Sequence, residues 1–107
     1  MLTTDMLYDR VASVCPIKRR EFEEDLACGV NELCAMFGER YVKEEGGALP
    51  VKQAYFTALC SIILFFRTGD PLDRRRFLDR AKEAFITVWR ERARQRRRAE
   101  ISDAKND

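Results

Sequence analysis

The sequence predicts an all-α protein: a small four-helix domain with a long antiparallel helical hairpin and a projecting basic C-terminal helix. Apolar residues recur at helical spacing in four segments, a Gly-Asp-Pro turn separates the last two, and an arginine-rich stretch follows the last apolar stripe. At 107 residues, with 46% hydrophobic and 36% charged residues, the chain fits one folded domain. We assign residues 1–98 to this domain, with an arginine-rich helix end from about residue 90, and residues 99–107 to a flexible acidic tail.

The front half predicts two helices. Thr3 or Thr4 can cap a first helix that runs to Val14, because Leu7, Val11 and Val14 share one face. Cys15-Pro16 ends that helix, and a second one starts near residues 17–19 and ends at Phe37. Its apolar stripe follows steps of 4, 4, 3 and 4 residues: Phe22, Leu26, Val30, Leu33 and Phe37.

Residues 39–49 have the composition of a loop, with Gly46-Gly47 and three acidic residues. Within this loop, Tyr41 and Val42 could form a brief strand or pack as an apolar plug. Pro50 then suits the first turn of a third helix, which we expect to end at Arg67.

The third and fourth helices should form the antiparallel hairpin. Apolar residues cover more than half of the third helix, which makes it the central one. Residues 68–71, Thr-Gly-Asp-Pro, combine a helix stop, a cap and a first helical residue, so residues 71–98 must fold back alongside. The expected core takes hairpin side chains and others packed across it: Leu59, Ile62, Phe66, Phe77 and Phe85, with Phe22, Leu26 and Leu33.

The residues needed for most catalytic mechanisms are missing, so we expect no enzymatic activity and no cofactor. The sequence has no histidine and no glycine-rich phosphate loop, and no serine lies beside a plausible base. Residues 21–25 are rich in carboxylates, but neighbours on a helix point in different directions, which predicts a solvated face.

We expect the four cysteines to be reduced residues of the core, without metal. The only near pair, Cys28 and Cys34, is separated by five residues, which is unlike the close pairs of zinc sites. The N-terminus has no basic stretch followed by an apolar segment, which predicts a cytoplasmic protein without a secretory signal. The longest apolar run, residues 54–66, is shorter than the roughly 20 residues of a membrane span, so we expect no membrane association.

The charge is distributed unevenly along the chain. Residues 1–73 carry a net charge of −4, residues 74–98 carry +8 and residues 99–107 carry −2. Six arginines lie between residues 90 and 98, and the planar guanidinium group suits bidentate pairing with carboxylate or phosphate. Three interpretations remain open: a solvated helix end, docking on an acidic protein or a neighbouring copy, and contact with nucleic acid.

The candidate partner-binding residues lie in this stretch and just before it. Trp89 stands at the border between the apolar stripe and the arginines, where a tryptophan can belong to an interface or to the edge of the core. The full candidate set is Trp89, Arg90, Arg92, Arg94, Arg96, Arg97 and Arg98.

The order of elements resembles the head-to-tail connector, or portal adaptor, proteins of tailed bacteriophages. The most specific part is residues 49–94, LPVKQAYFTALCSIILFFRTGDPLDRRRFLDRAKEAFITVWRERAR, with a proline-led apolar helix, a Gly-Asp break and a helix ending in alternating arginines. The front half agrees with that family in helix order only. The arginine run is denser than is usual for the family.

The resemblance implies a virion protein, assembled in the cytoplasm of the bacterial host. It implies a homo-oligomeric ring, of twelve copies by analogy, that docks onto the portal protein and extends the DNA channel towards a tail-side connector or stopper protein. DNA would pass through without sequence-specific contact, and the arginine-rich helix end, residues 90–98, together with the tail to Asp107 would be the docking element. The alternative is a small helical nucleic-acid-binding or regulatory protein that uses its basic C-terminal helix.

Overall fold

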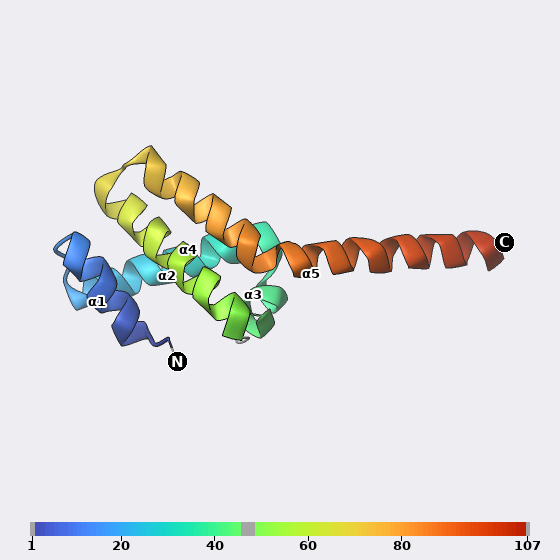
Figure 1. Cartoon of the computed structure of the whole chain (residues 1–107), viewed down its shortest axis with the longest axis horizontal. Coiled ribbons are helices and arrows are strands. Elements are labelled where there is room, and N and C mark those ends of the chain that lie inside the picture. The colour runs from blue at the N-terminus through green and yellow to red at the C-terminus, as the bar shows by residue number, and fades with distance from the viewer. Residues whose placement is uncertain (1, 46–48, 107) are drawn as a thin grey trace.

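The protein is all-α, with five helices and no strand in the part of the chain that the structure describes. This computed structural model describes residues 2–45 and 49–106, and their side chains except at residues 41, 44–45, 49–52, 87–89, 92 and 101–106. The helices are α1 (Thr4–Val14), α2 (Arg19–Phe37), α3 (Glu39–Glu45), α4 (Leu49–Thr68) and α5 (Pro71–Asn106). The molecule measures 61 × 29 × 19 Å, and its long dimension follows α5 beyond the body (Figure 1).

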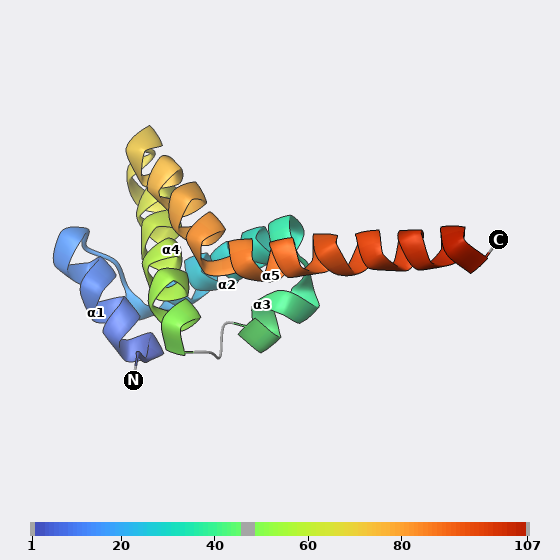
Figure 2. The same ribbon diagram turned by 45° about the vertical axis from the view of Figure 1, so that its right-hand side comes forward.

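The helices α4 and α5 form the predicted antiparallel hairpin, and they are the most extensively paired helices of the fold (Figures 1 and 2). Gly69 has a φ of 68°, the left-handed conformation in which glycine is favoured. Asp70 then caps α5, because its Oδ1 accepts a 3.0 Å hydrogen bond from the backbone N–H of Leu72. The turn therefore has the stop and restart that its sequence predicts.

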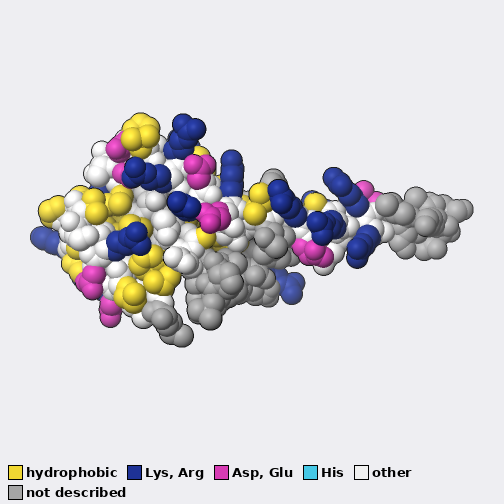
Figure 3. Space-filling model, viewed as in Figure 1, with side chains coloured by type: hydrophobic (Ala, Val, Ile, Leu, Met, Phe, Trp, Pro, Cys, Tyr) yellow, Lys and Arg dark blue, Asp and Glu magenta, His cyan; other side chains and the backbone are white. Residues whose placement is uncertain are grey.

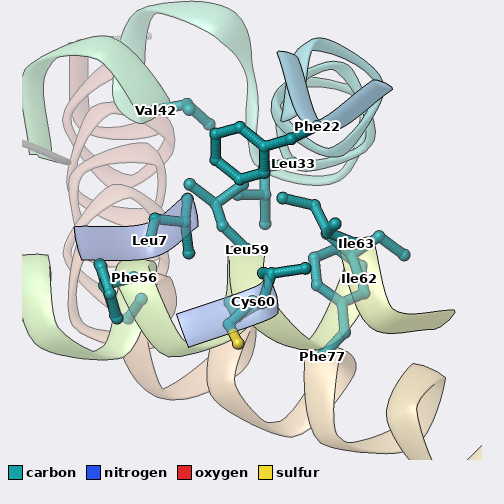
Figure 4. Close-up of a cluster of buried hydrophobic side chains, with 14 of the residues drawn as sticks. Leu7, Phe22, Leu33, Val42, Phe56, Leu59, Cys60, Ile62, Ile63 and Phe77 are labelled. Atoms are coloured by element: carbon teal, nitrogen blue, oxygen red, sulfur yellow. The ribbon is translucent and has the colours of Figure 1, made fainter. Parts of the chain in front are cut away.

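One core joins all five helices, and α4 lies at its centre. Phe22, Leu33 and Ile63 are fully buried, as are Val11 and Phe85. Figure 4 shows the cluster, which draws Leu7 from α1, Phe22 and Leu33 from α2, Val42 from α3, Leu59 and Ile63 from α4, and Phe77 from α5. Most of the expected core is confirmed: Leu59, Ile62, Phe77, Phe85, Phe22 and Leu33 are buried, and Leu26 is half-buried against them.

Two expected apolar contacts are wrong. Phe66 is 39% exposed, because α4 is uncovered as it approaches the hairpin turn, where residues 66–70 are all exposed. Val14 is 66% exposed, because α1 ends there and turns away at Cys15. The other two residues of that face, Leu7 and Val11, are buried as predicted, and Thr3 caps α1.

The predicted loop contains a short helix, so the expectation of four helices is wrong by one. Gly38, with a φ of 93°, ends α2 and allows α3 to begin at once. Lys43 and Glu39 lie one helical turn apart and form a 2.6 Å ion pair, and their hydrogen bond lowers the pKa of Glu39. Val42 is 3% exposed, which favours the apolar plug over the strand. The side chain of Tyr41 lies outside the described residues.

A glycine allows α2 and α4 to approach closely. Gly29 is buried, and a Cβ atom at this position would lie 2.8 Å from Cγ2 of Ile62 and 3.5 Å from Cδ2 of Leu59. Such a separation from Ile62 is too short for real atoms, so any larger residue would force the side chain of Ile62 or the helix that carries it to shift. None of the helices in the described part of the chain has the length and hydropathy needed to cross a bilayer.

Candidate functional site

The helix α5 leaves the body and continues as a solvent-exposed arm, which we define as residues 90–100. Among the described side chains of α5, Phe85 and Ile86 are the last that pack on the body, and every described side chain of the arm is exposed. Figures 1 and 2 show the arm extending far past the other four helices in both views. The predicted projection of the basic helix is therefore confirmed, and α5 continues to Asn106, beyond its expected end at residue 98. The expected flexibility of residues 99–107 stays a prediction.

Local sequence explains why the arm is helical without a core to pack on. Alanine, arginine, glutamine and glutamate all have high helix propensity, and they fill the arm. Arg94 and Glu91 add a weak, exposed ion pair at 4.0 Å. The arm nevertheless holds six arginines against two glutamates, a net charge of +4, and the mutual repulsion of the arginines opposes folding of an isolated helix.

The arginines are arranged by the helical repeat. Arg90, Arg94 and Arg98 are spaced by four residues, so they share one side of the helix within roughly 80° of arc, and Arg97 lies beside them. Arg96 lies on the opposite side. Figure 3 shows basic side chains along more than one edge of the arm. The arm therefore presents one dense arginine face and further positive charge elsewhere.

Five of the seven candidate residues can be placed with their side chains: Arg90, Arg94, Arg96, Arg97 and Arg98 are exposed on the arm. The side chains of Trp89 and Arg92 lie outside the described residues, so the choice between core edge and interface for Trp89 stays open. The backbone of both residues belongs to α5. The arginines lie along the arm without converging on a pocket, so the candidate site is an extended docking surface.

The sequence predicted a solvated face for the carboxylates of residues 21–25, but two of these carboxylates pair with another helix. Arg67, at the end of α4, donates from Nε to Oδ2 of Asp25 at 2.6 Å and from Nη1 to Oε2 of Glu21 at 2.7 Å. The hydrogen bond to Asp25 raises the pKa of Arg67 above its ordinary value. These two ion pairs link α2 and α4 near the hairpin turn. Glu23 and Glu24 remain as the exposed carboxylates of the group.

The far side of α2, away from Phe22 and Leu33, is a second exposed surface. Glu24, Cys28 and Glu32 recur every four residues on it, and all three are exposed. Glu24 has only a 3.7 Å contact with the exposed Arg20, and Glu32 makes no ion pair with any described residue. The i, i+4, i+8 spacing was visible in the sequence, but its significance depends on which side of α2 the core covers.

The cysteines have unlike environments, which corrects the expectation that they belong to the core. Cys60 is buried and Cys28 is exposed, whereas Cys15 and Cys34 are intermediate. Burial raises the pKa of the Cys60 thiol. Among the residues whose side chains are described, no three cysteine or carboxylate groups come close enough to hold a metal ion.

A small apolar groove lies at the base of the arm, between α2 and α5. It is lined by Met36, Phe37, Ile86 and the stem of Lys82, and Phe37 stacks on Phe85 with ring centroids 4.7 Å apart. Met36 is 40% exposed at its rim.

Comparisons with family models, with curated proteins and with solved structures found no match to this chain.

Proposed function

We propose that this protein is a structural subunit of the head-to-tail junction of a tailed bacteriophage. In this role, copies of the chain form a ring beneath the portal protein, twelve by analogy with connector proteins, and extend the DNA channel towards a tail-side connector or stopper. The chain acts by binding and not by catalysis, and it needs no cofactor. It is a virion protein assembled in the cytoplasm of the host, and DNA passes through the ring without sequence-specific contact.

One observation supports this proposal above the others: α5 holds a charged, fully exposed arm that contributes nothing to the described core. An arm of this kind can reach across to another protein, and arginine forms bidentate pairs with carboxylates. The resemblance of residues 49–94 to connector proteins supplies the identity of the partner, because the C-terminal segment of such proteins commonly reaches the portal. The docking element is therefore the arm, with Arg90, Arg94, Arg96, Arg97 and Arg98.

The proposal expects a portal gene in the same genome, and the test is co-expression of the chain with that portal protein, followed by purification of the portal. We expect the chain to co-purify as a ring and to be visible on the portal by electron microscopy. The variant Arg92→Gln, Arg94→Gln, Arg96→Gln, Arg97→Gln should fail to bind. A matched control removes four exposed arginines from the other end of the same helix: Arg74→Gln, Arg75→Gln, Arg76→Gln and Arg80→Gln. Equal binding by both variants would reject the docking role of the arm.

A second candidate function is nucleic-acid binding through the same helix, and the net charge of +4 on an unpacked arm favours it. This alternative expects the parent chain to bind duplex DNA with an affinity that falls steeply as salt rises. The arm variant should then lose both the affinity and the salt dependence. Strong salt-sensitive DNA binding together with normal portal binding by the arm variant would favour this function over the first.

A further inference from the structure

The arginine face of the arm has a complementary surface elsewhere on the same chain. The outward face of α2, defined here as Glu24, Cys28 and Glu32, is exposed and unpartnered by any other helix of the described chain. Its two carboxylates are eight residues apart, as are Arg90 and Arg98 of the arm. Eight residues of α-helix span ~12 Å, so both pairs of charges have the same separation.

We propose that the arm of one copy packs along the outward face of α2 of a second copy. Arg90 and Arg98 pair with the two carboxylates, Glu24 and Glu32, in either helix direction. Arg94 then lies over Cys28, whose small side chain leaves room for close approach of the two helices. The contact rests on the proposed ring assembly, and it identifies which surfaces of neighbouring subunits meet.

The contact must be made between two molecules. In one chain, α2 packs against α4 in the body, whereas the arm extends away from the body as a continuation of α5 (Figures 1 and 2). The other acidic residues of this part of α2 already have partners, because Glu21 and Asp25 pair with Arg67 and Glu23 pairs with Arg19. Each copy therefore offers one exposed acidic face, on which Glu24 has only a 3.7 Å contact with the exposed Arg20, and one basic arm.

A contact between two different surfaces is heterologous, so each copy can bind two others. Repetition of such a contact closes into a ring or continues as an open chain, depending on the rotation between neighbours. The arm keeps Arg96 on its opposite side, which remains exposed to a further acidic partner such as the portal. One arm can thus contact a neighbouring subunit and a third protein at once.

Cysteine crosslinking tests the contact, because Cys28 is already at its centre. Packed helix axes lie 8–10 Å apart, which brings facing Cα atoms towards the roughly 4.4–6.8 Å needed for a disulfide. Arg94→Cys should therefore give a ladder of disulfide-linked multimers under mild oxidation, and adding Cys28→Ala should remove the ladder. Arg96→Cys is the matched control, since it deletes the same charge from the opposite side of the arm. A ladder of equal strength from Arg96→Cys, or no ladder from Arg94→Cys, would overturn the proposal.

Charge reversal gives a second test that does not depend on oxidation. We expect that Glu24→Arg, Glu32→Arg and, separately, Arg90→Glu, Arg98→Glu abolish association in sedimentation experiments, while circular dichroism stays that of the parent. Mixing the two variants should restore association, because each arm then meets a face of opposite charge. High salt should weaken the parent assembly, since exposed pairs are screened. A mixture that stays monomeric, or variants that each assemble as the parent does, would contradict the pairing.

These experiments use the purified chain alone, so they separate the contact from the proposed function. A ladder from Arg94→Cys together with no binding to the portal supports the contact and rejects the portal role. Portal-bound rings of Arg94→Cys that form no crosslink to Cys28 overturn the contact and support the portal role.

Discussion

The two halves of α5 have the same backbone geometry but opposite roles. Between Phe77 and Phe85 the helix is fixed by burial, and it shares the core with all four other helices. From residue 90 onwards every described side chain is exposed, and the helix depends on its own propensity. The first half therefore supports the fold, whereas the second half is free to bind, and substitutions in the two halves should affect different measurements.

The largest loss of stability is expected from Phe85→Ala. Phe85 is 1% exposed and contacts the rings of Phe37 and Tyr55, so its removal leaves a cavity among three helices. Such truncations cost about 3–5 kcal/mol, a large part of the stability of a small domain. Urea denaturation followed by circular dichroism measures this loss.

Phe66→Ala is the control for that measurement, because it removes the same ring from the exposed end of α4. Phe66 is 39% exposed, so its truncation should cost much less than that of Phe85. Similar losses for the two variants would mean that the hairpin turn is covered in solution, for example by another copy of the chain.

Gly29→Ala should have the next largest effect. Alanine is the better helix former by about 0.5–1 kcal/mol, but its Cβ would lie 2.8 Å from Cγ2 of Ile62, and overpacking costs about 1–3 kcal/mol. We expect a net destabilisation of about 1 kcal/mol. In the background of Ile62→Ala, which removes the opposing methyl group, Gly29→Ala should become neutral or stabilising. A cycle in which the two substitutions are additive would exclude the close approach of α2 and α4 at this point.

The sequence predicted the parts of the fold that depend on local periodicity. The structure confirms the helices predicted from apolar stripes, the turn at Gly69-Asp70, and the exposure of the arm, which has no apolar stripe. All three predictions come from local sequence. The sequence could not predict that Gly29 faces Ile62, or that Arg67 pairs with Asp25, which lies 42 positions earlier in the chain. These contacts depend on how the helices cross. The short helix α3 was missed for a similar reason: it depends on the burial of Val42 against the rest of the fold.

The same distinction applies to the candidate site. The arginine run was recognised from composition, and its exposure followed from the missing apolar stripe. The outward face of α2 was not recognised, because a row of Glu24, Cys28 and Glu32 acquires meaning only once the core is known to cover the other side of the helix. The exposed side of a packed helix is therefore harder to predict than a charged segment.

Arg67→Gln should have a smaller effect than Gly29→Ala. The substitution removes the guanidinium group from Glu21 and Asp25, and it leaves the half-buried carboxylate of Asp25 without its partner. We expect a modest fall in melting temperature, and we expect added salt to reduce the difference from the parent. Arg75→Gln is the control, because Arg75 is exposed and forms no ion pair with a described residue. Equal melting temperatures for the two variants would show that the ion pairs of Arg67 add nothing to stability.

The smallest effect on stability is expected from the substitutions with the largest expected effect on binding. Replacing Arg92, Arg94, Arg96 and Arg97 with glutamine removes four charges from a helix that already lies outside the core, and glutamine is also a good helix former. Because the mutual repulsion of the arginines falls, the melting temperature should be unchanged or slightly higher than that of the parent. Binding to the portal should be lost in the same samples, as measured by co-purification, whereas association between copies should persist in sedimentation at low salt because Arg90 and Arg98 are unchanged. A clear drop in melting temperature would mean that the arm packs on the body of its own chain, and it would remove the distinction between the two halves of α5.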